Sequence, residues 1–160
     1  MLLHLIRHAD AGDPEAWTGP DAARPLSEKG RAQAERLGVF LAEHDFKTDA
    51  IITSPKLRAA QTAEIVAGHL GVSVTTDDRL GEPLDLKKLD VVLRDAGNPD
   101  RPTLVGHDPD FTEFVSDLCS APKVSMRKGA LAKIEVDRPL RTAGGTLRWL
   151  IPPDALRPKR

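Results

Sequence analysis

The sequence predicts an α/β domain, a three-layer sandwich in which a mostly parallel central sheet is flanked by helices. Short apolar runs at 2–6, 50–53 and 102–106 have the length and composition of strands that are buried on both faces. Segments with the three-and-four spacing of amphipathic helices separate these runs. Because strands that alternate with helices return through crossover connections, this order favours a parallel sheet with helices on both sides.

The first strand is expected from Leu2 to Ile6 and is closed by Arg7. This apolar run is too short for a membrane span and lacks the basic start of a signal peptide, so a cytoplasmic location is expected. A loop rich in Gly, Pro and Asp follows at 11–25. Helical spacing then predicts a helix at about 27–44, with Ser27 as its N-cap.

The second strand and helix follow at once. The strand at 50–53 runs into Ser54 and Pro55, residue types that favour an N-cap and the first position of a helix. Gly71 is expected to end that helix, because glycine is the common residue after a helix C-terminus.

The rest of the chain continues the same alternation and ends in a hairpin. Strands are predicted at 72–76, 102–106, 130–136 and 145–151, and helices at 86–96 and 109–119. We therefore expect one domain over 1–155, with 156–160 as a frayed, solvated tail.

The composition excludes several classes of partner and site. The 23 Lys and Arg residues nearly balance the 24 Asp and Glu residues, so the net charge of -1 supplies no global field for nucleic acid or an anionic membrane. One cysteine, Cys119, cannot form an internal disulfide or a cysteine zinc cage. We expect no nucleic-acid or membrane partner and no metal, and any anion site must be local.

Three short motifs place Arg or His just after predicted buried strands. Arg7 and His8 follow the first strand, Arg58 lies in the opening turn of the helix after the second, and His107 follows the strand at 102–106. Ligands of open α/β sheets bind at the carboxyl ends of the strands, so one crevice is expected to hold these side chains. Guanidiniums match phosphate oxygens and imidazoles can attack or exchange a proton, which together predict a phosphoryl site.

These residues also carry a resemblance to a known family. The matching segments are Leu5-Ile6-Arg7-His8-Ala9, the stretch from Ser54 to Thr62, Val105-Gly106-His107-Asp108-Pro109, and Arg24 to Gly30 followed by Gln33-Ala34. In this order they resemble the histidine phosphatase superfamily over most of the chain. The short length and the compact stretch before His107 are most similar to phosphohistidine phosphatases of the SixA type.

The resemblance implies a fold like that of phosphoglycerate mutase and a transiently phosphorylated histidine. His8 is then the nucleophile, and Arg7, Arg58 and His107 bind the phosphoryl group. No metal or organic cofactor is implied. A neutral imidazole is a competent nucleophile, and cationic donors neutralise the oxygens of a transferring phosphoryl group, so the chemistry of the residues agrees.

The substrate class depends on the proton donor. Glu82 stands roughly where ester-cleaving relatives carry an acid, because an alkoxide leaving group needs a proton. An imidazole leaving group can already carry its proton, which favours phosphohistidine on a protein. Two alternatives stay open: a small-molecule phosphomonoesterase with Glu82 as proton donor, and a phosphoprotein-binding module without turnover. The oligomeric state is left open.

Other polar residues near the motifs have structural interpretations. Asp10 and Asp108 flank the two histidines but are expected to cap a turn or a helix. Arg24 is expected to pair with a surface acid, and His4 to be a hydrogen-bonded histidine of the core.

Overall fold

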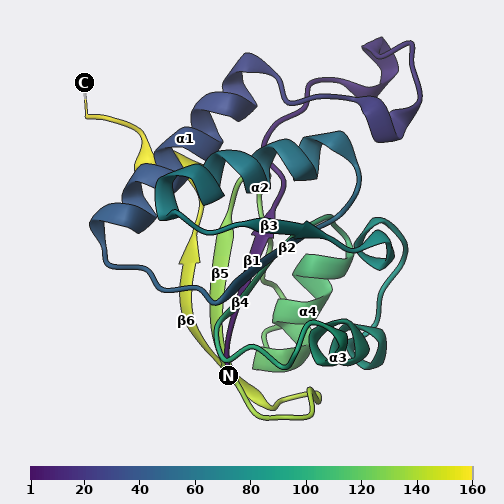
Figure 1. The fold of residues 1–160 in the computed structure, drawn as a ribbon, viewed down its shortest axis with the longest axis vertical. Coiled ribbons are helices and arrows are strands. Elements are labelled where there is room, and N and C mark those ends of the chain that lie inside the picture. Colours follow the sequence, from purple (N-terminus) through teal and green to yellow (C-terminus); the bar gives the residue numbers. More distant parts are fainter. Residues whose placement is uncertain (160) are drawn as a thin grey trace.

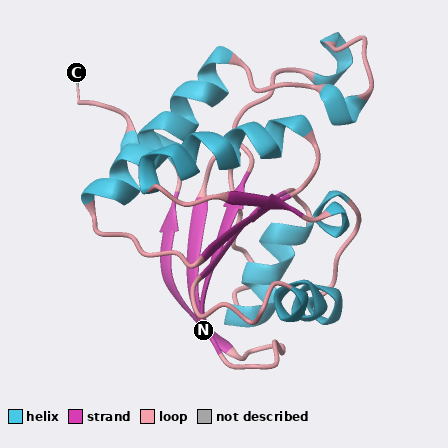
Figure 2. Cartoon of the chain, viewed as in Figure 1, coloured by secondary structure: helices cyan, strands magenta, loops and turns pink. Residues whose placement is uncertain are grey.

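The computed structural model describes residues 1–159, in which one six-stranded sheet lies between two layers of helices (Figure 1, Figure 2). The predicted three-layer α/β fold is confirmed. The strands are β1 (Leu2–Arg7), β2 (Ala50–Thr53), β3 (Val74–Thr76), β4 (Pro102–Gly106), β5 (Leu131–Val136) and β6 (Gly145–Ile151). The helices are α1 (Glu28–Glu43), α2 (Leu57–Leu70), α3 (Leu86–Asp95) and α4 (Asp110–Cys119).

The order of the strands in the sheet is β3-β2-β4-β1-β5-β6. β3, β2, β4 and β1 are parallel, whereas β5 pairs antiparallel with both β1 and β6. The carboxyl ends of β1, β2 and β4 therefore lie side by side at one edge of the sheet, where parallel α/β proteins bind ligands.

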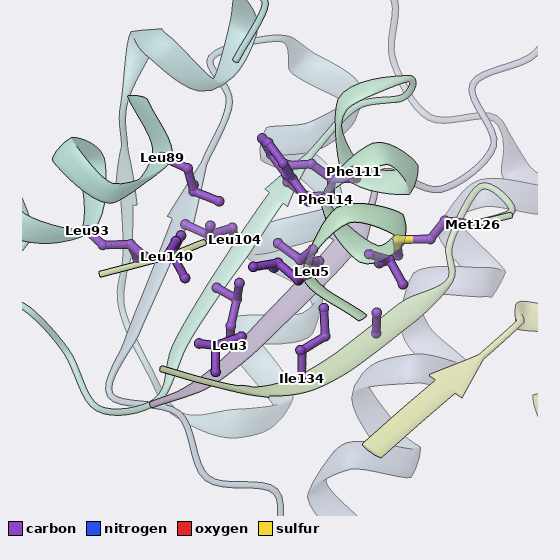
Figure 3. Close-up of a cluster of buried hydrophobic side chains, with 14 of the residues drawn as sticks. Leu3, Leu5, Leu89, Leu93, Leu104, Phe111, Phe114, Met126, Ile134 and Leu140 are labelled. Atoms are coloured by element: carbon purple, nitrogen blue, oxygen red, sulfur yellow. The ribbon is translucent and has the colours of Figure 1, made fainter. Parts of the chain in front are cut away.

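The two faces of the sheet bury separate clusters because successive strand residues point to opposite sides. On one face, Leu3, Leu5 and Leu104 pack against Phe111 and other residues of α3 and α4 (Figure 3). On the other face, Ile6 and Val105 pack with residues of α1 and α2. Each fully buried Leu or Ile contributes about 1.5–3 kcal/mol relative to an exposed position, so both helix layers are held firmly on the sheet.

The ends of α1 and α2 can be compared with the capping residues that the sequence predicts. The Ser27 hydroxyl accepts a hydrogen bond from the Gly30 amide at 3.0 Å, so the N-cap of α1 is confirmed. Gly71 ends α2 with φ of 67°, as expected. The expectation for Ser54 and Pro55 was wrong, because α2 begins only at Leu57 and Ser54 lies in the turn before it.

The C-terminal segment turns back toward the first helix. After β6 a short 3-10 helix, Pro153–Leu156, packs against α1 (Figure 1). The tail expected at 156–160 includes Arg160, which lies outside the described residues. Within residues 1–159, no helix combines the length and the apolar character that crossing a membrane requires.

Candidate active site

Backbone hydrogen bonds fix the site residues at the carboxyl edge of the sheet. The His8 amide donates to the Gly106 carbonyl, and the Ser54 amide donates to the Val105 carbonyl, each at 3.0 Å. These bonds extend the strand ladders by one residue and bring the three loops together. The imidazole centroids of His8 and His107 consequently lie 5.2 Å apart.

His8 presents one free ring nitrogen. Its Nδ1 lies 2.7 Å from the carbonyl oxygen of Ala9. A carbonyl only accepts, so Nδ1 carries the proton and Nε2 keeps its lone pair. Burial lowers the pKa of His8 to about 4, and the positive charges of Arg58, Arg7 and Lys128 add to that shift against the opposing hydrogen bond to Ala9. The imidazole is therefore neutral and nucleophilic at physiological pH.

His107 is held by a serine. Its Nε2 lies 2.7 Å from the hydroxyl oxygen of Ser54, which also accepts a hydrogen bond from the Lys56 amide. Burial is the main reason that the pKa of His107 falls to about 3, and His8, Lys56 and Arg58 lower it further. His107 is thus neutral in the free protein. A phosphoryl dianion bound beside it would raise this pKa, because a nearby negative charge favours the protonated imidazolium.

The two arginines are anchored by their terminal nitrogens. Arg7 donates from Nη1 to the Met126 carbonyl at 2.7 Å and lies 3.2 Å from a carboxylate oxygen of Asp108. Arg58 donates from Nη1 to the Asp21 carbonyl at 2.9 Å and from Nη2 to the Asp21 carboxylate at 3.0 Å. The Nε atom of each arginine has no partner, so each guanidinium keeps a donor that is not used within the protein.

Unpartnered buried donors gather in this site. Among residues 1–159, the buried side-chain nitrogens without a hydrogen bond are Nε of Arg7, Arg36 and Arg58 and Nδ1 of His107. All but the one in Arg36 belong to the residues that the sequence singled out. Because a buried polar atom without a partner costs free energy, this grouping indicates a site for an anionic ligand with several acceptor oxygens.

Glu82 lies beside this group rather than within it. It is exposed and lines a pocket of about 230 Å³ that His107, Lys56 and Asp108 also line. The sequence-predicted residues thus fall into a buried centre, formed by Arg7, His8, Arg58 and His107, and one carboxylate at its rim.

The flanking aspartates have the structural roles that were expected. The carboxylate of Asp10 accepts from the Ser27 hydroxyl at 2.6 Å and from the Gly12 amide. The carboxylate of Asp108 accepts from the amide and hydroxyl of Thr112 in the first turn of α4. His4 is likewise the bonded core histidine that was predicted, because its Nδ1 lies 3.2 Å from Oγ1 of Thr103.

Three further residues support the site in roles that the sequence did not reveal. Asp21, in the loop before α1, holds Arg58 and also lies 3.4 Å from Arg24, so the acid expected to pair with Arg24 is shared with the site. Arg24 itself is buried and donates to the Ala11 carbonyl. Ser54 is the third supporting residue. Its position directly after β2 was the sequence signal that could have placed it at the site. No sequence pattern marked Asp21.

The described residues, 1–159, were also compared with the requirements of a metal site. Within the described range, 1–159, no set of three His, Cys, Asp or Glu side chains is arranged to hold a metal ion.

Comparisons with known proteins agree with the geometry. A family model described as the histidine phosphatase superfamily (branch 1) matches residues 3–88. An uncharacterized protein of Picosynechococcus is 33% identical over 121 residues, which cover 74% of this chain and 73% of that protein. Phosphohistidine phosphatase SixA of Escherichia coli is 25% identical over 158 residues, which cover 96% of this chain and 94% of that protein. A solved structure of the protein histidine phosphatase SixA with tungstate has a TM-score of 0.83 at 24% identity, over 98% of this chain and all of that one, and supports the fold.

Proposed function

This chain belongs to the histidine phosphatase superfamily, and from that premise we propose that it removes the phosphoryl group from phosphohistidine on a protein, with His8 as the nucleophile. The observation that carries the proposal is the free Nε2 of a neutral His8 beside the unpartnered donors of Arg7, Arg58 and His107. The likeness to SixA over nearly the whole chain supports the substrate class.

The reaction has two steps. In the first, the Nε2 lone pair of His8 attacks phosphorus, a P–N bond forms, and the P–N bond to the substrate imidazole breaks. The leaving imidazole keeps the electron pair and departs neutral when it carries a proton on its other nitrogen. In the second, water attacks phosphorus and the bond to Nε2 breaks. The electron pair returns to Nε2 of His8, and both protons of the water leave with the phosphate as H2PO4−.

The site residues would act by position and charge. Arg7 and Arg58 offer Nε donors to the equatorial oxygens, and His107 offers Nδ1–H when Ser54 bonds to its Nε2. Donors held in place before the reaction stabilise the charge that develops in transfer, and one such donor is typically worth about a hundredfold or more in rate. Phosphoryl transfer depends mainly on this kind of positioning.

The surroundings favour a protein over a small phosphoester. The pocket beside His107 measures about 230 Å³, which is below the roughly 300–1,000 Å³ usual for sites that enclose a small ligand. A recess of this size suits a phosphorylated side chain presented by another surface. An imidazole leaving group also needs no acid close to the scissile bond.

One observation favours a second candidate, a phosphomonoesterase. Glu82 and His107 line the same pocket, so a carboxylic acid at the rim could protonate an alkoxide leaving group. A binding module without turnover has less support, because anion binding needs donors and does not need a nucleophile.

The test is phosphate release by wild type, His8→Ala and Glu82→Gln from a phosphohistidine protein and from a panel of phosphomonoesters, with a chelator present. We expect His8→Ala to lose at least about a thousandfold in rate, and Glu82→Gln to keep its rate on phosphohistidine. His44→Ala, which alters an exposed histidine at the end of α1, is the matched control. Faster, Glu82-dependent ester hydrolysis would favour the phosphomonoesterase, and turnover without His8 would contradict the nucleophile.

A further inference from the structure

A second polar pocket adjoins the candidate active site on the side of Arg7. Its volume is about 400 Å³. It is built where the end of β1, the first turns of α1, the loop before β5 and the 3-10 helix after β6 meet. The residues that line it include Arg7, Lys29, Arg127, Lys128 and Arg157, together with Asp10 and Asp154. We call it the basic pocket.

The basic pocket carries more positive than negative charge, because five cations line it against the two carboxylates of Asp10 and Asp154. Asp154 is paired with Arg157 at 3.2 Å, and Arg7 is paired with Asp108, also at 3.2 Å. Asp10 accepts from the Ser27 hydroxyl and keeps its negative charge, and the charges of Lys128 and Lys29 help to lower its pKa. Within residues 1–159, Lys29, Arg127 and Lys128 form no ion pair. Because like charges repel, such a local excess is unfavourable for folding in a chain whose net charge is only -1.

The basic pocket shares Arg7 with the phosphoryl site. Arg7 belongs to both, since its side chain lines the pocket while its unpartnered Nε lies among the site donors. Lys128 is close enough to His8 to lower the pKa of that imidazole. An anion in the basic pocket would therefore lie next to a phosphoryl group bound at His8.

The other pocket at the site has a different charge. The pocket beside His107 is lined by Glu82, Asp108 and Asp110, with Lys56 as its cation. A substrate that carries further negative charge is consequently favoured in one orientation, with its additional anions toward Arg7 and away from Glu82.

We propose that the basic pocket is a second anion-binding subsite, which takes acidic side chains adjacent to the phosphorylated histidine of the substrate protein. The choice of phosphohistidine rests on the function proposed above, whereas the preference for acidic neighbours rests on this pocket. Lys29, Arg127 and Arg157 are exposed. Cations that stand on the surface suit carboxylates of a docking protein better than a small ligand that must be enclosed.

The test uses peptides with a central phosphohistidine or phosphotyrosine, each flanked either by Glu or by Gln. The readout is the ratio of kcat/KM for the Glu-flanked to the Gln-flanked form of each peptide. We expect wild type to prefer the Glu-flanked form by roughly tenfold at low salt, with the preference shrinking at high salt, because exposed charge pairs are weak singly and screened by ions. The double variant Lys29→Gln/Arg127→Gln should reduce the ratio to within about twofold of unity.

A matched control separates this pocket from net charge. Lys87→Gln/Lys88→Gln removes the same charge from exposed positions on α3, which packs on the other face of the sheet. This control should keep the preference. Equal loss in both double variants, or no preference in wild type, overturns the subsite.

The two peptide series keep this proposal distinct from the proposed function. Faster turnover of phosphotyrosine than of phosphohistidine would contradict the function, and the ratio within the phosphotyrosine series would still test the subsite. A small bisphosphate tests whether the basic pocket binds a small molecule instead of a protein side chain. If Lys29→Gln/Arg127→Gln slows its hydrolysis and leaves the peptide ratios unchanged, the occupant is a small molecule and the proposal is wrong.

Discussion

The hydroxyl oxygen of Ser54, at the end of β2, lies 2.7 Å from Nε2 of His107, at the end of β4. The same oxygen accepts a hydrogen bond from the Lys56 amide, so the hydroxyl proton is directed elsewhere and can be donated to Nε2. A neutral His107 then carries its own proton on Nδ1, the atom without a partner in the protein. Ser54 is thus a positioning residue that selects the tautomer of His107.

Replacing Ser54 tests this relationship. In Ser54→Ala we expect kcat to fall about tenfold to a hundredfold, in line with the loss of one buried hydrogen bond, with a smaller change in KM. Steady-state kinetics on a phosphohistidine substrate measures the split between the two constants. Ser54→Cys offers a weak donor of the same branching and should recover part of kcat. Equal losses in both variants, or a loss that follows the melting temperature, would indicate a packing role only.

The Asp21 carboxylate would compete with a bound phosphoryl group for the positive charge of Arg58. It lies 3.0 Å from Nη2 of Arg58, which also lowers the pKa of that carboxyl and keeps it ionised. Asp21→Asn keeps an oxygen acceptor for Arg58 and removes the negative charge. We expect inorganic phosphate to inhibit this variant roughly two- to fivefold more tightly, because a like charge close to the dianion is gone.

Asp45→Asn is the control variant for Asp21→Asn, because it makes the same change of charge at an exposed residue that follows α1. Inhibition constants for phosphate in the two variants and wild type give the result. Weaker inhibition in Asp21→Asn would mean that the carboxylate mainly orients Arg58.

His8 should stay neutral well below physiological pH. Burial disfavours the charged imidazolium and lowers the pKa of His8 from 6.5 to about 4. Titration of its ring by NMR in the free protein should give a midpoint near 4, so that the nucleophile is available throughout the range from pH 5.5 to 8. A midpoint at 6 or above would show that solvent reaches the ring. Bound inorganic phosphate should raise the midpoint, because the dianion favours imidazolium.

His4 makes folding sensitive to acid. Burial lowers its pKa from 6.5 to about 3, so between these values the unfolded chain binds a proton that the folded chain does not. The free energy of unfolding therefore decreases as pH falls through this window. From pH 7.5 to pH 5, wild type should lose on the order of 2 kcal/mol more than His4→Leu.

Urea unfolding at the two pH values measures this difference. The substitution leaves Thr103 satisfied, because its hydroxyl also lies 2.8 Å from that of Thr48. A parallel loss of stability in wild type and His4→Leu would mean that other groups control the acid sensitivity.

The sequence by itself determined the layers of the fold and which residues form the buried centre of the candidate active site. Apolar runs of strand length alternate with segments that have helical spacing. Such runs bury both of their faces when they pair as a parallel sheet covered by the helices. In such a sheet the strand ends meet at one edge. Arg7 ends β1, His8 and His107 directly follow β1 and β4, and Arg58 lies in the first turn of the helix after β2, so their convergence was predictable from the sequence alone.

The tertiary structure alone decided how these groups are charged and supported. The low pKa values of His8 and His107 come from burial by segments distant in the chain. Likewise, Asp21 meets Arg58 because an irregular loop folds back, and no periodic pattern specifies a loop. The basic pocket depends on residues from both ends of the chain, so its charge excess exists only once β1, α1 and the C-terminal turn have packed together.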